Sequence, residues 1–362
     1  MAQSLLFIPD ISGFTNFVQT TEAEHSQHVI SELLEILISS NTIGLQLAEV
    51  EGDALFFYKK HNIPTREHLL AQIEAMYASF YSHLKLLEKN RICTCNACAM
   101  APKLELKIVA HCGEIQYLNV QGKKKPFGQS VIETHRLLKN NIQSDNYIII
   151  STQLAQELKM PLKYKSNLYT FIEGVEYYDN KEITFIYSEI DNSLLKLLPF
   201  ESPEVIEFNR EPNLTFKIDI DVNANEVLEI ITNYKYRASW VKGVDKFEYN
   251  ESEVTRLGSE HVCVINGKHF NFKTVTKKVD DDELVYGEIT DNPRILDRFY
   301  QFYIIKPLAN NKSTLTSALY WIVTSPINKL IVQLFAKNLL KKSVKTSLTN
   351  LKKFAEGLEQ KG

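Results

Sequence analysis

Two short motifs place carboxylates where they could hold cations. The first, FIPDISGFTNF, puts Asp10 at the end of an expected strand. The residues that lead from there into a helix are Ile11, Ser12, Gly13, Phe14 and Thr15. Such a turn offers backbone N–H groups and the positive end of a helix to a phosphate. The second motif, EVEGD, puts Asp53 at the tip of a hairpin.

If these two strands are neighbours, the carboxylates of Asp10 and Asp53 converge. Two hard oxygen anions beside a phosphate-binding turn can hold two Mg²⁺ or Mn²⁺ ions. The alternative is that Asp10 caps a helix and that Asp53 belongs only to a Gly-Asp hairpin turn.

Three of the five cysteines lie within six residues, in the sequence CTCNAC. Cys93, Cys95 and Cys98 can wrap three thiolates around one ion, and Zn²⁺ needs a fourth ligand. The candidates for it are His111 and Cys112, at the end of the following strand. Because clustered cysteines in a reducing compartment are more often metal ligands than disulfides, we expect structural zinc here. A loop of unligated thiols is the alternative.

Composition sets the broad class of the protein. At about 150 residues per domain, 362 residues predict two domains. The charge of 41 − 44 = −3 gives no basic field for nucleic acid. The first ten residues do not resemble a signal peptide, and no apolar run approaches the roughly 18 residues that span a bilayer. We expect a bacterial-type cytoplasmic protein without an integral membrane segment.

The first half alternates helices with strands and hairpins. We expect a strand at LLFI that ends at Pro9, a hairpin of LQLAEV with ALFFY, and a helix from Ile73 to Leu87. LELKIVAH is an expected strand with EIQYLNV as its hairpin partner, and GKKKPFG an expected loop. The helix SVIETHRLLKN and the strands YIIIS and EITFIYSEI follow. This order predicts an α+β sandwich with a mixed, ferredoxin-like sheet. Residues 192–211 are the expected linker.

The second half starts afresh with an alternating strand from Phe216 to Val222. The helix NANEVLEIITN follows, capped by Asn223 or Asn225. Six strand-like runs come next, and a long helix ends the chain. One face of that helix is apolar, and its other face is basic, because eight Lys and two Glu lie between Pro326 and Gly362.

The motifs of the first half resemble the catalytic domain of class III nucleotide cyclases. The pairing of D-I-x-G-F-T with E-x-x-G-D carries the resemblance. KIVAHCGEI, PFGQSVIETHRLL and YIIISTQLAQEL resemble further segments of that family in the same order, across about residues 5–190. The resemblance implies a cyclase-type α/β sandwich over residues 1–191.

The same resemblance implies roles for individual residues. Asp10 and Asp53 match the two metal-binding aspartates, and the backbone carbonyl of Ile11 assists them. Glu49 falls on the position that reads the base, where Glu is the choice for guanine. Lys125 falls on the second base-reading position, where family members carry a small polar residue.

Three more positions bear on activity. Arg136 matches the arginine that stabilises the transferring phosphoryl group. Ile132 replaces the asparagine that orients the ribose, which puts efficient cyclisation in doubt. Lys181 is the candidate for gripping the terminal phosphates. Class III sites are built across a dimer interface, so the resemblance implies a homodimer in which Asp10 of one chain faces the partner's Arg136.

The second half resembles the START-like (SRPBCC) superfamily over residues 212–358, and we assign residues 212–362 to such a helix-grip domain. FKIDIDVNANEVLEIITNYKYRASWVKGV and RLGSEHVCVINGKHFNFKTVTKKV carry this resemblance. It implies a cavity for a small hydrophobic ligand. Candidate lining residues are Tyr236, Trp240, Phe270, Tyr300, Tyr303 and Trp321, for which plain core packing is the alternative.

Two functions follow from these observations. One is a metal-dependent purine nucleotide cyclase with a preference for guanine, tuned by a ligand of the second domain in signalling. The other is a non-catalytic sensor that binds a nucleotide, a lipid or another small molecule. Asp10, Asp53 and Arg136 favour the first, and Ile132 favours the second.

Overall fold

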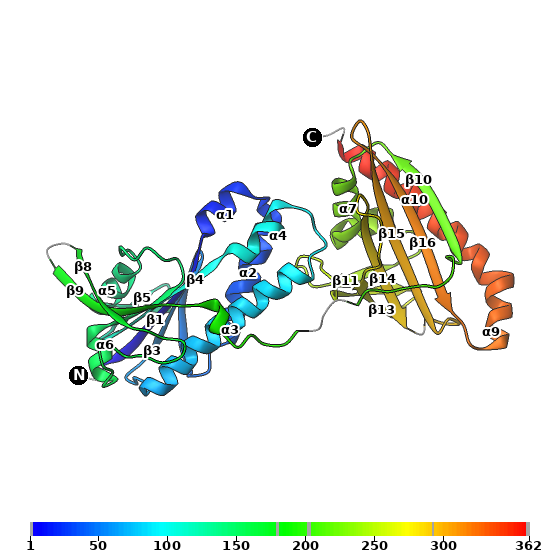
Figure 1. Ribbon diagram of the computed structural model, residues 1–362. Coiled ribbons are helices and arrows are strands. Elements are labelled where there is room, and N and C mark those ends of the chain that lie inside the picture. Colours follow the sequence, from blue (N-terminus) through cyan, green and yellow to red (C-terminus); the bar gives the residue numbers. More distant parts are fainter. Residues whose placement is uncertain (1–2, 179–180, 201–203, 292, 360–362) are drawn as a thin grey trace. The chain divides into compact units, whose positions relative to one another are not determined.

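The computed structural model describes residues 3–178, 181–200, 204–291 and 293–359 (Figure 1). Residues 201–203 of the expected linker lie outside them. The chain divides into two compact units, the first formed by residues 1–88 and 96–200 and the second by residues 89–95 and 201–362. Both units combine helices with a large sheet, which confirms a mixed α+β protein.

A seven-stranded mixed sheet organises the first unit. In spatial order its strands are β2 (Gln46–Glu51), β3 (Ala54–Lys59), β1 (Ser4–Ser12), β4 (Glu105–Gly113), β7 (Tyr147–Ser151), β9 (Lys181–Glu189) and β8 (Ile172–Tyr178). β4 and β7 are parallel, and the other pairs are antiparallel. The sheet therefore brings β1, with Asp10, next to the hairpin that carries Asp53.

Among the described residues, six α-helices accompany this sheet: α1 (Phe14–Thr20), α2 (Ala23–Ser39), α3 (Arg66–Lys89), α4 (Asn96–Met100), α5 (Gln129–Leu137) and α6 (Thr152–Glu157). The expected apolar stripe of α3 is buried, with Ile73, Met76 and Phe80 fully covered. On one face of the sheet, Val131 of α5 packs against a cluster that includes Ile8 of β1.

Two expectations for the strands were wrong. β1 does not end at Pro9 but continues to Ser12, and Pro9 pairs with Ile108 of β4. The ladder between β1 and β3 is not formed at Pro9, which has no N–H to donate.

The expected loop GKKKPFG is in fact largely a strand. β5 (Gln116–Val120) pairs with β6 (Lys123–Phe127) as a separate two-stranded sheet, and not with β4 as expected. Gln121 and Gly122 join them with φ angles of 49° and 78°. Two successive positive φ angles are typical of the tight turn that suits a two-residue hairpin.

The second unit contains a seven-stranded antiparallel sheet. Its strands, in spatial order, are β10 (Leu214–Ile220), β16 (Lys312–Ile322), β15 (Arg298–Leu308), β14 (Leu284–Asp291), β13 (Lys268–Val275), β12 (Glu260–Ile265) and β11 (Lys246–Tyr249). The helices are α7 (Ala224–Thr232), α8 (Arg237–Trp240), α9 (Pro326–Ile331) and α10 (Lys337–Glu359), and a π-helical segment, Val332–Ala336, joins the last two.

The long C-terminal helix lies along this sheet (Figure 1). Val344, Leu348, Leu351 and Ala355 of α10 are buried in one core with residues of the sheet and of α7. The cap of α7 is Asn223, whose side chain accepts a hydrogen bond of 2.9 Å from the Glu226 N–H.

Candidate functional site

The backbone places the two aspartates side by side. Asp10 lies opposite Ala54 of β3 on one side and opposite Lys107 of β4 on the other. The Ile11 N–H donates to the carbonyl oxygen of Asp53 at 3.1 Å. Because Asp53 directly precedes β3, it sits at the end of the hairpin nearest to Asp10.

This pair carries excess negative charge. Burial, together with the charge of Asp53, raises the pKa of Asp10 to about 6, and burial also raises the pKa of Asp53. Lys107 opposes both effects. Its ammonium, however, is 2.8 Å from the carboxylate of Asp145, whose own charge adds to the rise at Asp10. Sequence reasoning missed Lys107 and Asp145, although a lysine inside a buried strand pattern was a usable signal.

The turn after Asp10 is shorter than expected, because Ile11 and Ser12 belong to β1. Gly13 adopts φ +86° and precedes α1, and the Phe17 N–H donates to the Gly13 carbonyl at 2.9 Å. Phe14 is half-buried and Thr15 is exposed. With only seven residues, α1 can add little dipole to the turn.

The two expected base-reading residues contact each other. The Nζ atom of Lys125, on β6, lies 2.5 Å from a carboxylate oxygen of Glu49, on β2. Both side chains are 42% exposed, so solvent reaches the pair. A hydrogen-bond acceptor and a donor are thus presented together at the surface.

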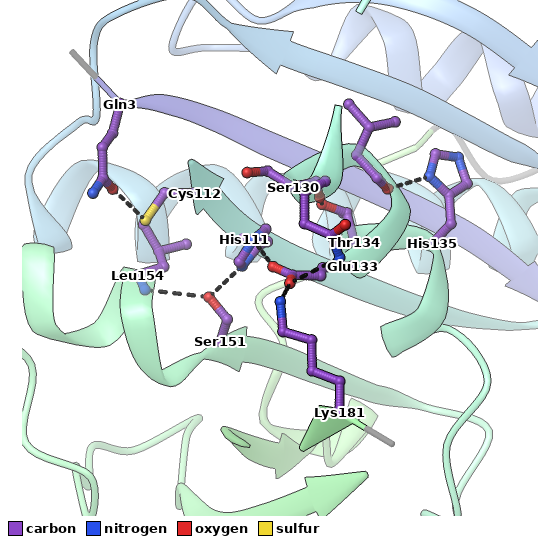
Figure 2. A network of polar contacts seen from close by, with 12 residues as sticks. Gln3, His111, Cys112, Ser130, Glu133, Thr134, His135, Ser151, Leu154 and Lys181 are labelled. Carbon is purple, nitrogen blue, oxygen red and sulfur yellow. Dashed lines mark hydrogen bonds and ion pairs between the residues drawn. The ribbon is translucent and has the colours of Figure 1, made fainter. Parts of the chain in front are cut away.

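Lys181 belongs to a separate polar network (Figure 2). Its ammonium pairs with Glu133 of α5, and His111 Nε2 lies 3.4 Å from the same carboxylate. His111 Nδ1 is 2.8 Å from Ser151 Oγ, which also accepts from the Leu154 N–H. The contacts with His111 and Lys181 lower the pKa of Glu133 to about 2.

Arg136 lies on α5, with its guanidinium carbon 5.2 Å from the centre of the Tyr178 ring. Ile132, one turn earlier, is 47% exposed. An exposed isoleucine offers no hydrogen bond to a ribose at this position. Tyr178 had not been singled out from the sequence, because β8 itself was missed.

The cysteine cluster acquires a different fourth residue from the ones expected. Ligand atoms of Cys93, Cys95, Cys98 and His25 all lie within 4.8 Å of one another. His25 is in the first turn of α2, and its Nδ1 is 3.7 Å from Cys98 Sγ. All five cysteines are in the described part of the chain, and none forms a disulfide.

The expectation that His111 or Cys112 supplies the fourth zinc ligand is therefore corrected. His111 is engaged with Ser151 and Glu133. The Cys112 thiol donates to Gln3 Oε1 at 3.0 Å, and burial raises its pKa to about 12. A thiol held protonated in this way is a poor ligand.

The expected cavity residues divide between the two faces of the second sheet. Trp240, Tyr303 and Trp321 are buried in the core beneath α10, with Tyr236 at its edge. Tyr300 lies in the core on the opposite face, as the alternation along β15 requires.

Phe270 is half-buried, and the guanidinium carbon of Arg294 lies 5.7 Å from its ring centre. Beneath α10, a buried ion pair joins Arg237 to Glu288 at 2.6 Å. The predicted lining set thus does not form one group.

In the described residues, no helix is long and apolar enough to cross a bilayer.

Sequence comparisons find relatives of part of the chain. The family model described as "Protein of unknown function (DUF2652)" matches residues 30–147. The uncharacterized protein Rv2561/Rv2562 of Mycobacterium tuberculosis is 31% identical over 127 residues, which are 35% of this chain and 59% of that protein. The chain thus spans about three-fifths of the length of the curated relative it matches.

Similar solved structures cover about half of the chain. The adenylyl cyclase CyaB from P. aeruginosa is 16% identical, over 52% of this chain and 94% of that chain, with a TM-score of 0.38. The guanylate cyclase domain of RhGC from Catenaria anguillulae, solved with GTP, is 13% identical over 52% and 97%, with a TM-score of 0.38. The hypothetical protein jhp0584 from Helicobacter pylori is 10% identical over 43% and 99%, with a TM-score of 0.35.

Proposed function

We propose that the first unit binds a purine nucleotide together with divalent cations, and that it is a cyclase-type domain. The observation that carries this proposal is the pair Asp10 and Asp53, whose pKa values are raised. The one lysine that opposes this rise at both aspartates, Lys107, is paired with Asp145 instead. Carboxylate oxygens fit Mg²⁺ or Mn²⁺, which would replace the missing positive charge. The carbonyl of Ile11 would be a further oxygen ligand.

Each remaining residue has a role in the proposed reaction. Bound metal ions would acidify the attacking 3′ hydroxyl and share the charge of the phosphates. Arg136, supplied by the second chain of a homodimer, would stabilise charge that develops on the transferring phosphoryl group. Glu49 would accept from the N1–H and N2–H₂ groups of guanine, and Lys125 would donate to O6. The contact of Glu49 with Lys125 places these two groups side by side, and a bound guanine would replace their ion pair.

Turnover is tested by incubation with Mn²⁺ and each of four nucleoside triphosphates. We expect cyclic product from GTP above all, and loss of that product in Asp53→Ala. If no nucleotide yields product while GTP still protects the protein against thermal unfolding in the presence of Mn²⁺, the domain is the non-catalytic sensor. If Mn²⁺ and nucleotides neither react nor stabilise the protein, the nucleotide proposal is wrong.

For the second unit we propose a helix-grip domain for a small hydrophobic ligand. The support is the long helix α10 over a seven-stranded antiparallel sheet, with Trp240 and Tyr303 between them. A hydrophobic probe such as ANS should bind the native protein and be displaced by fatty acids. Absence of any saturable binding at native pH would contradict this.

A structural zinc centre is the third property that we propose. His25, Cys93, Cys95 and Cys98 supply the one imidazole and three thiolates of a closed tetrahedral site. Zinc bonds of about 2.0–2.3 Å place neighbouring ligand atoms about 3.6–3.8 Å apart. The 3.7 Å between His25 Nδ1 and Cys98 Sγ already matches that spacing.

The surroundings hold this ligand loop in place. The Glu22 carboxylate accepts from the N–H groups of Asn96 and Ala97, at 3.2 and 2.9 Å, which fastens the start of α4 beside α2. The Cys95 N–H donates to Cys93 Sγ at 3.4 Å, a contact that stabilises a thiolate.

Metal analysis of the purified protein tests the centre. We expect about one zinc per chain, and a loss of most of it in His25→Ala. Cys112→Ser is the matched control and should keep its zinc. Equal zinc in wild type and His25→Ala would exclude His25 as a ligand, and far less than one zinc in the wild type would exclude the site.

A further inference from the structure

One segment of the second unit exposes an unusual number of large apolar side chains. Among the described residues, eleven such side chains are more than half exposed, and five of them lie between residues 327 and 339. These five are Ile327 (72%), Leu330 (58%), Leu334 (55%), Phe335 (66%) and Leu339 (71%). Isolated exposed apolar residues are normal, but a cluster of this kind marks a surface that another body covers.

The exposed residues do not belong to the core-facing stripe of the same helices. Val332 and Val344 face the core beneath α10, with Ala336 and Leu340 packed at its edge. The segment of α9, the π-helical turn and the start of α10 therefore has two apolar faces. One stabilises the fold, and the other is left in solvent. A π-helical turn holds an extra residue, and such bulges are frequent at functional sites.

The charges of this segment favour one kind of partner. Between residues 326 and 345 there are five lysines and no Asp or Glu. All five are exposed: Lys329, Lys337, Lys341, Lys342 and Lys345. A helix that exposes an apolar face among lysines is typical of segments that lie in the interface of an anionic membrane. An acidic cluster on a second copy would be the other way to balance this charge.

We propose that residues 326–345 form a docking surface for a membrane of anionic lipids. Leu330, Leu334, Phe335 and Leu339 insert among the acyl chains, and the lysines contact the lipid phosphates. The segment lies on the membrane and does not span it, since its buried face stays in the core of the second unit. Binding weakens as salt screens the lysines.

Sedimentation of the full-length protein with vesicles tests this surface. We expect binding to vesicles that contain phosphatidylglycerol, and binding about tenfold weaker to phosphatidylcholine alone. The variant Leu334→Ser/Phe335→Ser should lose at least about tenfold in affinity for the anionic vesicles. The control Leu194→Ser/Leu198→Ser removes two equally exposed leucines elsewhere, 55% and 54% exposed, and should bind as wild type.

The alternative occupant is a second copy of the chain. Light scattering of the same variants distinguishes it: an interface between copies on this face would give Leu334→Ser/Phe335→Ser a smaller assembly mass than the wild type, whereas a homodimer formed through the first unit alone would keep its mass. Failure of the wild type to bind anionic vesicles, or unchanged binding by the variant, would overturn the proposal. Circular dichroism of each variant shows whether it is folded.

Discussion

Two carboxylate sites of the first unit are in opposite electrostatic states. At Asp10 the pKa is raised to about 6, because the carboxyl is buried beside Asp53. At Glu133 the pKa is lowered to about 2, because His111 and the Lys181 ammonium lie against the carboxylate. Asp10 lies on β1, and Glu133 lies on α5, which packs against β1 and β4.

We infer from this difference that the Glu133 network serves the fold and that the pair Asp10 and Asp53 is the candidate ligand site. Glu133 is paired with the Lys181 ammonium and contacted by His111, so its network stabilises the packing of α5 on the sheet. Asp10 and Asp53 are left with unbalanced negative charge, which costs stability unless a cation binds. The missing charge, and not the presence of carboxylates, identifies the candidate site.

The largest expected effect is on cyclase turnover, in variants that each remove one of the two halves of the proposed site. Asp53→Ala and Arg136→Ala should each lower cyclase turnover at least about a hundredfold. An equimolar mixture of the two variants should recover about a quarter of wild-type turnover, because a heterodimer contains one intact site. If the mixture is as inactive as each variant while both still dimerise, the site is not shared between chains.

A buried histidine of the second unit, His261, adds a third case to the comparison: a base whose pKa is lowered by burial. Burial lowers the pKa of His261 to about 4, with Glu288 and Arg237 nearby. The unfolded chain takes up this proton first, so stability should fall as the pH drops from about 6.5 to 4, by about 3 kcal/mol. Urea unfolding measured across this range checks the slope. His261→Phe, which can stack on Phe272 as the imidazole does, should flatten it.

Glu133→Gln should weaken the network around Glu133 and leave the pair Asp10 and Asp53 unchanged. We expect a loss of about 2 kcal/mol in unfolding free energy, because the charge-assisted hydrogen bond from Lys181 and the contact with His111 are weakened. Affinity for Mn²⁺ should remain that of the wild type. Reduced Mn²⁺ affinity in a folded Glu133→Gln protein would show that the two sites are not separate.

Asp10→Asn should have the smallest effect on stability, and of the opposite sign. A folded-state pKa above the unfolded value means that the ionised Asp10 destabilises the fold at pH 8. We therefore expect Asp10→Asn to gain about 1 kcal/mol at pH 8 in the absence of metal, and less at pH 5. Destabilisation of the metal-free protein at pH 8 would contradict the proposed charge imbalance.

The spacing of apolar residues along the sequence predicted the hairpin around Gly52 and the long helices. The strand-like runs LQLAEV and ALFFY on either side of Gly52 predicted the hairpin that carries Asp53, and the helical spacing of apolar residues predicted α3 and α10. The β5–β6 pair was missed because Lys123, Lys124 and Lys125 give a strand without apolar alternation. Such a polar run is indistinguishable from a loop when its only partner is one other strand.

Contacts between distant residues could not be predicted in the same way. His25 lies far upstream of the cysteines, and only the packing of α2 against α4 brings it to Cys98. Lys107 meets Asp10 through the register of β1 with β4, which no local pattern encodes. The expected ligands His111 and Cys112 were chosen for nearness in sequence, and the fold engages them elsewhere.

The most direct test of the account is a calorimetric titration of the full-length protein with Mn²⁺ in the presence of GTP. The account predicts saturable binding in the wild type and in Glu133→Gln, and its loss in Asp53→Asn. Equal Mn²⁺ binding by wild type and Asp53→Asn, or none by a folded wild type, would contradict the claim that the unbalanced pair of aspartates is the cation site.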